Sequence, residues 1–166
     1  MKAIVYTSET GNTKAYADLL GEQLSLPVYD LREARKVLRR GEPILYLGWL
    51  FAGHLKGYRK AASRYCIKCV CGVGLGDSGS QIDGVRRAEK MSADLPLFTL
   101  QGGMDHEKLR GVNRFMIRML TKMMSQKQDC TEDEERMLEL LIKGGNYVSL
   151  ENLSEVLAWA RTTFAE

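Results

Sequence analysis

Over residues 2–101, short apolar runs alternate with segments in which apolar positions recur at intervals of three and four. The runs are typical of strands and the spaced segments of amphipathic helices. One run, residues 43–48, is apolar throughout, as expected of a strand covered on both faces. The pattern predicts strands at residues 2–6, 27–31, 43–48, 67–74 and 96–101. It predicts helices between them at residues 13–24, 33–40, 54–65 and 80–92.

The last third of the chain has no clear strand pattern. Helical spacing covers residues 107–124 and 131–143, and a closing helix is expected from Ser149 or Leu150 to Phe164. Strands that alternate with helices form a parallel sheet with helices on both faces. We therefore predict one α/β domain over residues 1–166, a three-layer sandwich around a five-stranded parallel sheet. Residues 104–148 would form a helical insertion after the fifth strand.

Composition is that of an ordinary globular protein, with 45% hydrophobic and 27% charged residues. A formal net charge of +3 is too small to indicate a nucleic-acid partner. No apolar run approaches the roughly 18 residues that span a bilayer. The N-terminus lacks the apolar core of a signal peptide, so we expect a cytoplasmic protein.

The cysteines raise the question of disulfides or a metal site. Cys69 and Cys71 would share one face of the strand at residues 67–74. No second cysteine pair and no nearby histidine completes a tetrahedral metal site. We therefore expect no metal and interpret all four as buried free thiols: Cys66, Cys69, Cys71 and Cys130.

The loop between the first strand and the first helix reads Thr-Ser-Glu-Thr-Gly-Asn-Thr. A helix that begins there aims its free N–H groups and the positive end of its dipole at an anion. The loop has hydroxyl and amide donors but not the lysine of a nucleotide triphosphate loop, so it suits a phosphate monoester. The alternative is a threonine-rich helix cap. The candidate phosphate-binding residues are Ser8, Glu9, Thr10, Gly11, Asn12 and Thr13.

At these positions the chain resembles the flavodoxins, whose motif T/S-x-T-G-N-T after the first strand holds the phosphate of FMN. Ser8, Thr10, Gly11, Asn12 and Thr13 match that motif. The resemblance implies a flavodoxin-like fold with strand order 2-1-3-4-5. It also implies FMN as the cofactor.

In an open parallel sheet the ligand lies at the carboxyl ends of the strands, where the strand order reverses. The segments after the third and fourth strands would therefore hold the flavin ring. Trp49 and Phe51 would be flat partners for the ring, or else pack on the sheet edge. Gly-Leu-Gly-Asp-Ser at residues 74–78 resembles the corresponding flavodoxin loop, although the tyrosine that usually follows is missing. The candidate ring-binding residues are Trp49, Leu50, Phe51, Ala52, Gly53, Gly74, Gly76 and Asp77.

Two further features have open interpretations. His54 would be a proton donor near the flavin or, as we prefer, a residue at a helix start. The helix at residues 107–124 has an apolar, methionine-rich face and a basic stripe of Arg110, Arg114, Arg118 and Lys122, and an acidic segment follows it. Three interpretations are possible. The helix and the acidic segment would neutralise each other as a salt-bridged hairpin, or the stripe would dock an acidic redox partner. In the third, the helix would make a peripheral membrane contact.

Residues 114–124 also resemble bacterial quinone-dependent protoporphyrinogen oxidases, FMN enzymes of flavodoxin fold with an added helical segment. The Thr-Asp-Trp before the last helix of that family is absent, and Leu-Glu-Asn-Leu stands at residues 150–153. Two functions follow: an FMN-binding electron carrier with a redox partner protein, or an oxidoreductase acting on a small molecule such as a porphyrinogen or a quinone. An FMN-sensing or scaffold domain is a third. No catalytic residue is assigned.

Overall fold

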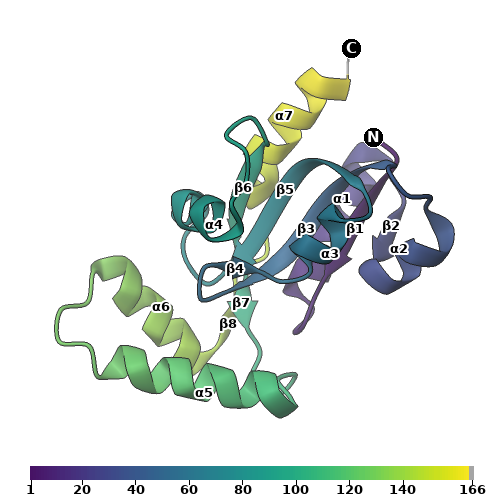
Figure 1. Cartoon of the computed structure of the whole chain (residues 1–166). Helices are drawn as coiled ribbons and strands as arrows, with labels where there is room; N and C mark the ends of the chain where they lie inside the picture. Colours follow the sequence, from purple (N-terminus) through teal and green to yellow (C-terminus); the bar gives the residue numbers. More distant parts are fainter. Residues whose placement is uncertain (165–166) are drawn as a thin grey trace.

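The computed structural model describes residues 1–164. Its centre is a twisted parallel sheet with the order β2-β1-β3-β5-β6 (Figure 1). Counted along the chain, these five strands have the predicted order 2-1-3-4-5. A short strand, β4 (His54–Leu55), is added antiparallel to the end of β3. The five parallel strands are β1 (Ala3–Thr7), β2 (Val28–Asp30), β3 (Pro43–Phe51), β5 (Cys66–Gly74) and β6 (Leu97–Gln101).

Helices cover both faces of the sheet, so the predicted three-layer α/β architecture is confirmed. Alternate strand residues point to opposite faces, so Ile4 packs on one side while Ala3 and Val5 pack on the other. One face is covered by α1 (Asn12–Leu24), the 3-10 turn η1 (Glu151–Leu153) and α7 (Ser154–Phe164). The other is covered by α2 (Leu31–Val37), α3 (Tyr58–Ala62) and α4 (Ile82–Glu89).

The cysteine predictions are confirmed in part. Cys69 and Cys71 are buried on the α1 side of the sheet, on the same face of β5. Burial raises the pKa of the Cys69 thiol well above its usual value. All four thiols are free, but Cys66 is exposed and Cys130 is half-buried, so the expectation of burial is wrong for those two.

The helix predicted at residues 54–65 is wrong in its first half. Ala52 and Gly53 have φ angles of 49° and 78°, and they form the two-residue turn of a β-hairpin between β3 and β4. Positive φ at both central residues is typical of the type I′ turn, one of the two common two-residue hairpin turns. The chain therefore folds back on β3 before α3 begins at Tyr58.

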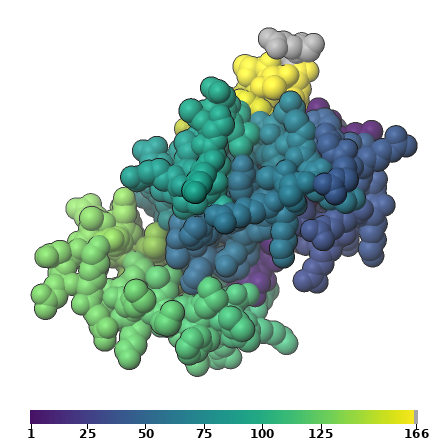
Figure 2. Space-filling model, viewed as in Figure 1, coloured from purple at the N-terminus to yellow at the C-terminus, as the bar shows by residue number. Residues whose placement is uncertain are grey.

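The insertion leaves the sheet as a helical hairpin, visible at the lower edge of Figures 1 and 2. It contains β7 (Gly103–Met104), α5 (Gly111–Ser125), α6 (Glu132–Lys143) and β8 (Gly145–Asn146). Both helices were predicted, although α5 begins later than expected. The expectation of no strand here is wrong, because β7 and β8 pair antiparallel at the base of the hairpin.

The insertion has a small hydrophobic core of its own. Met104, Leu109, Ile117 and Leu141 form it. The same cluster contacts Phe51 of β3 and Leu75, which follows β5. The insertion is therefore packed against the carboxyl edge of the sheet. None of the helices in the described residues combines the length and the hydropathy needed to cross a membrane.

Candidate functional site

The loop between β1 and α1 presents backbone donors at the edge of the sheet. Gly11 precedes α1 with φ of 101°, a conformation that favours glycine. Ser8 Oγ accepts hydrogen bonds from the Gly11 N–H at 3.2 Å and the Lys14 N–H at 3.4 Å. In the described part of the chain, the N–H groups of Asn12 and Thr13 donate no hydrogen bond. These two groups, at the start of the helix, remain available to an anion.

The side chain of Asn12 has a structural role that the sequence did not indicate. Its Nδ2 donates to the carbonyl oxygen of Gly103 at 2.8 Å and to Thr10 Oγ1 at 3.5 Å. The amide thus links the phosphate loop to the first residue of β7. Because of this contact, the loop and the base of the insertion are held together.

Trp49, Leu50 and Phe51 belong to β3 rather than to a loop after it, which corrects the predicted end of that strand. The ring centroids of Trp49 and Phe51 lie 6.0 Å apart, and Lys56 Nζ lies 5.5 Å and 5.4 Å from them. Leu50 packs next to Gly74, where an added Cβ would approach Leu50 Cδ1 to 3.2 Å. The two aromatic rings pack together and also line the pocket described below.

The segment after β5 is divided between two roles. Gly74 lines the pocket, and its carbonyl oxygen accepts a hydrogen bond from the Gly102 N–H at 2.7 Å. Asp77 instead forms an ion pair with Arg136 of α6, with Oδ2 at 3.1 Å from the guanidinium. Its Oδ1 also accepts a hydrogen bond from Gln101 Nε2 at 3.3 Å. Asp77 therefore ties the insertion to the sheet.

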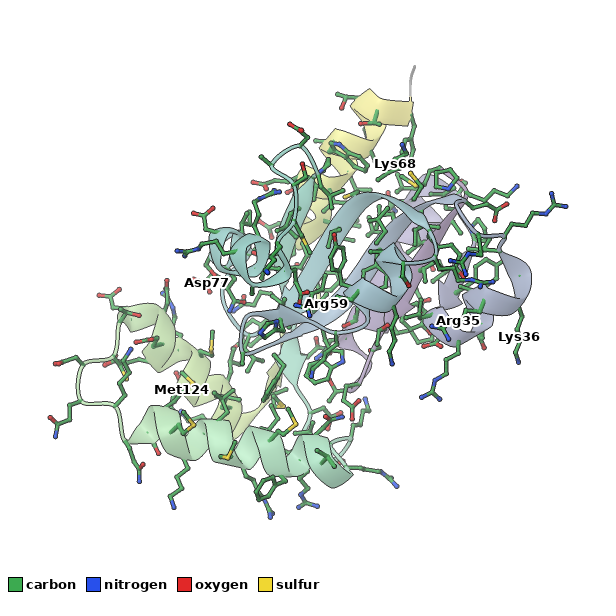
Figure 3. The ribbon with its side chains drawn as sticks, in the orientation of Figure 1. Arg35, Lys36, Arg59, Lys68, Asp77 and Met124 are labelled. Carbon is green, nitrogen blue, oxygen red and sulfur yellow. The ribbon has the colours of Figure 1, made fainter. Side chains whose placement is uncertain are left out.

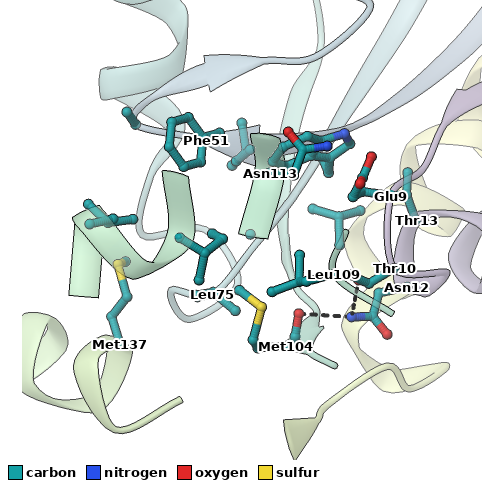
Figure 4. Close-up of a pocket in the computed structure, with 18 of the residues that line it drawn as sticks. Glu9, Thr10, Asn12, Thr13, Phe51, Leu75, Met104, Leu109, Asn113 and Met137 are labelled. Atoms are coloured by element: carbon teal, nitrogen blue, oxygen red, sulfur yellow. Dashed lines mark hydrogen bonds between the residues drawn. The ribbon is translucent and has the colours of Figure 1, made fainter. Parts of the chain in front are cut away.

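The three predicted segments meet in one pocket at the carboxyl ends of β1, β3 and β5 (Figure 4). It encloses about 780 Å³, part of which is open to solvent. Of the predicted residues, Ser8, Gly11, Gly76 and Asp77 do not line it. Those that do are Glu9, Thr10, Asn12, Thr13, Trp49, Leu50, Phe51, Ala52, Gly53 and Gly74.

The insertion forms the remaining wall of this pocket, which sequence analysis missed. In Figure 4, Leu109 and Met104 of the insertion lie on the side nearer the phosphate loop, and Met137 lies on the far side. The helical spacing of α5 indicated an apolar face, but not the surface that this face covers. The wall is apolar apart from one amide and consists of Met104, Leu109, Asn113, Ile117, Leu120 and Met137.

A second, basic groove lies beside the phosphate loop, between α2 and α3. It shares Ser8, Glu9, Trp49 and Asn113 with the loop and the first pocket. We call it the basic groove, because its five cations outnumber its carboxylates, Glu9, Asp30 and Glu89. The cations are Arg32, Arg35, Lys56, Arg59 and Lys60.

Glu89 organises one side of the basic groove. Its carboxylate, 3% exposed, accepts hydrogen bonds from the Leu55 N–H at 3.0 Å and Arg59 Nε at 3.0 Å, and lies 3.2 Å from His54 Nδ1. Burial by itself would raise the pKa of Glu89, but these hydrogen bonds outweigh burial and lower it. His54 therefore belongs to β4 and faces Glu89. The interpretation of His54 as a helix-start residue is wrong.

The charges of α5 are not neutralised by the acidic segment that follows. Arg110, Arg114, Arg118 and Lys122 form no ion pair with any carboxylate in residues 1–164. The acidic segment is paired elsewhere, for instance through Glu134 and Lys127. The interpretation as a salt-bridged hairpin is therefore wrong.

Comparison with known proteins agrees with this geometry. A family model described as a flavodoxin domain matches residues 3–131, well over half of the chain. Searches of the curated proteins and of the solved structures found no match. The resemblance to protoporphyrinogen oxidases therefore has no support among the comparisons. With its sheet order, its loop after β1 and this match, the chain belongs to the flavodoxin domain family.

Proposed function

We propose that the protein binds FMN and transfers electrons through the bound flavin. The observation that carries the proposal is the loop at residues 8–13, which opens a helix at the carboxyl edge of the sheet beside a largely apolar pocket. Membership of the flavodoxin domain family supports it. FMN supplies the redox chemistry when bound, while the protein binds and orients it and limits its contact with water.

The donors of the loop suit a phosphate monoester. Two free N–H groups at the start of α1 and the positive end of the helix dipole would face the phosphate. Thr10 and Thr13 add hydroxyl groups at the wall of the pocket. The nearest lysine, Lys14, forms an ion pair with Asp18 at 2.6 Å on the exposed side of α1. The loop thus binds by hydrogen bonds rather than by a lysine, as expected for a monoester.

The pocket beyond the loop suits an aromatic ring. Trp49 and Phe51 line one side, and Leu75 and Leu109 line others. These side chains offer an apolar surface, while the backbone at Ala52 and Gly53 would offer polar groups. A few polar groups in an apolar pocket are typical of cofactor sites.

The second candidate function is an oxidoreductase of the protoporphyrinogen oxidase type, acting on a porphyrinogen or a quinone. The observation that favours it is the apolar wall contributed by Leu109, Ile117, Leu120 and Met137. An electron carrier needs only an accessible flavin edge, whereas an enzyme also needs room for a substrate beside the ring. No acid, base or nucleophile of this chain is assigned to the chemistry.

For the electron carrier, the partner would be a redox protein with an acidic surface. The cations of the basic groove lie beside the phosphate loop, and complementary charge guides the encounter of redox partners. We place the protein in the cytoplasm, and the four free thiols in the described residues support this.

The double variant Thr10→Ala/Thr13→Ala tests the phosphate site. Each lost hydrogen bond to a charged group costs roughly 1.5–3 kcal/mol, so FMN binding should weaken by several kcal/mol. Riboflavin, which lacks the phosphate, should bind the variant and the parent protein equally. Fluorescence titration with both ligands measures this, with Thr162→Ala on α7 as the control. An equal loss of affinity for FMN and riboflavin, or no loss for either, would refute the assignment of the loop as the phosphate site.

A further inference from the structure

One side of α5 exposes large apolar side chains to solvent. The exposed fractions are 73% for Val112, 67% for Phe115, 50% for Met119 and 62% for Met123. Spacings of three and four residues align these side chains along the helix, away from buried Ile117. We call this row the apolar stripe. Single exposed apolar side chains are ordinary, but a continuous row marks an interaction surface.

The basic stripe runs beside the apolar stripe. Its three residues within α5, Arg114, Arg118 and Lys122, follow at intervals of four and so lie on one side of the helix. All three are exposed and, within the described residues, free of ion pairs with carboxylates. No residue of α5 is acidic. The outward surface of α5 therefore combines an uncovered apolar row with uncompensated positive charge.

A groove between α5 and α6 adjoins the basic stripe. Arg114, Arg118 and His106 line it together with Ile117 and Ile142. Cations next to apolar side chains match the chemistry of an amphiphile, whose phosphate meets the cations while its first carbon atoms meet the apolar wall. The chemistry of the groove therefore indicates the same kind of ligand as the two stripes, an anionic amphiphile.

The position of α5 suits a flat surface. One side of the helix covers the pocket, and the helix lies along the outer edge of the molecule, away from both termini (Figures 1 and 2). We propose that α5 docks on an anionic phospholipid bilayer, with the apolar stripe at the acyl boundary and the basic stripe among the headgroups. A protein partner is disfavoured, because protein interfaces place a polar rim around an apolar centre. Here the charge lies on one side of the apolar row only.

Co-sedimentation with vesicles tests the proposal. We expect binding to vesicles of equal parts phosphatidylcholine and phosphatidylglycerol, weaker binding to phosphatidylcholine alone, and weakening by salt. At roughly 1 kcal/mol per cation, Arg114→Gln/Arg118→Gln/Lys122→Gln should lower the affinity about a hundredfold. Phe115→Ser/Met119→Ser/Met123→Ser should also abolish most of the binding.

A matched charge control separates docking from general attraction. Lys36→Gln/Lys68→Gln/Arg161→Gln removes the same charge from exposed positions on other faces, two of them (Lys36 and Lys68) labelled in Figure 3, and should leave most of the binding intact. Val37→Ser, at a residue 59% exposed on α2, is the apolar control. Circular dichroism verifies that each variant is folded. None of the substituted residues of α5 lines the FMN pocket, so FMN affinity should not change and vesicle binding is read independently of the proposed function.

Four outcomes would overturn the proposal. The first is no preference for anionic vesicles. The second is an equal loss of vesicle binding in the basic-stripe variant and in the charge control. The third is a parent protein that is dimeric while the apolar-stripe variant is monomeric, because the stripe would then join two copies. The fourth is displacement by inorganic phosphate beyond that by chloride at equal ionic strength, which would indicate a site for free phosphate.

Discussion

Glu89 connects three segments that meet beside the phosphate loop. It ends α4, and its buried carboxylate receives hydrogen bonds from the backbone of Leu55 and the side chain of Arg59. Arg59 is 73% exposed, so water weakens its ion pair, whereas the backbone hydrogen bond is buried. The contact to Leu55 therefore contributes most to the position of the β3–β4 hairpin.

The lowered pKa of Glu89 predicts a dependence of stability on pH. The folded-state pKa lies below the unfolded value of about 4.3, so the unfolded state binds more protons as the pH falls. The stabilisation is complete above the unfolded-state pKa and is lost as the pH falls through the folded-state pKa. Glu89→Gln should lower the free energy of unfolding at neutral pH by about 1.5–3 kcal/mol and flatten the acid slope.

Urea unfolding at neutral and acidic pH measures this effect. Glu155→Gln, at an exposed position of α7, serves as the control and should keep the acid slope of the parent protein. If Glu89→Gln also kept that slope, the hydrogen bonds of Glu89 would not be the source of the pH dependence.

Two predicted cofactor residues show where local sequence stops being informative. The motif around Asn12 predicts a helix start and a set of donors, and the structure contains both. Asn12 donates a hydrogen bond to the carbonyl oxygen of Gly103, and Asp77 forms an ion pair with Arg136. Neither partner belongs to the local motif that predicted Asn12 or Asp77. Both partners come from the insertion, far along the chain. Their contacts depend on tertiary packing, which the spacing of residues in a loop does not specify.

At the scale of elements, the chain enters and leaves the insertion at one narrow point. Gly103 pairs with Asn146, and Met104 pairs with Gly145. The strands approach so closely that a Cβ on Gly103 would lie 2.1 Å from the Gly145 carbonyl oxygen. The two ends of the insertion are therefore neighbours. Neither hydrophobic core of the sheet includes a residue from 105–144.

This attachment predicts that the insertion is separable from the fold. Replacing residues 105–144 by Asn-Gly, which favours a two-residue hairpin turn, should give a protein that folds. It should still bind FMN through the phosphate loop, but the pocket would lose the wall to which Leu109 and Ile117 contribute. Riboflavin affinity should therefore fall, because the ring is its main contact. Circular dichroism and ligand titration measure both effects. An unfolded product, or unchanged riboflavin affinity, would contradict this account.

Element prediction succeeded where the hydrophobic pattern is continuous and failed where a turn decides the path. The strand at residues 67–74 is apolar apart from Lys68 and appears as β5 almost unchanged. Residues 54–65 have helical spacing, but the left-handed conformations of Ala52 and Gly53 place the start of that segment in a hairpin. β7 and β8 contain two residues each, too few for a pattern to develop.

At the scale of the whole molecule, positive charge gathers on two separate surfaces, the basic groove and the outward side of α5, although the net charge is only +3. The basic groove lies on one side of the phosphate loop, and α5, with its basic stripe, covers another part of the pocket. Such a distribution attracts anionic partners or surfaces more strongly than the net charge suggests. The sequence predicted the basic stripe from its spacing. The basic groove joins residues from α2 and from the β4–α3 segment, so it is visible only in the fold.

Anaerobic photoreduction of the protein with FMN, followed by visible absorption, tests the central claim most directly. The account predicts that FMN binds, that its spectrum shifts on binding, and that light reduces the bound flavin reversibly. Reduction in two separate one-electron steps would indicate the electron carrier, and a single two-electron step would indicate the enzyme. A protein that leaves the spectrum of FMN unchanged and does not retain FMN on gel filtration would contradict the account.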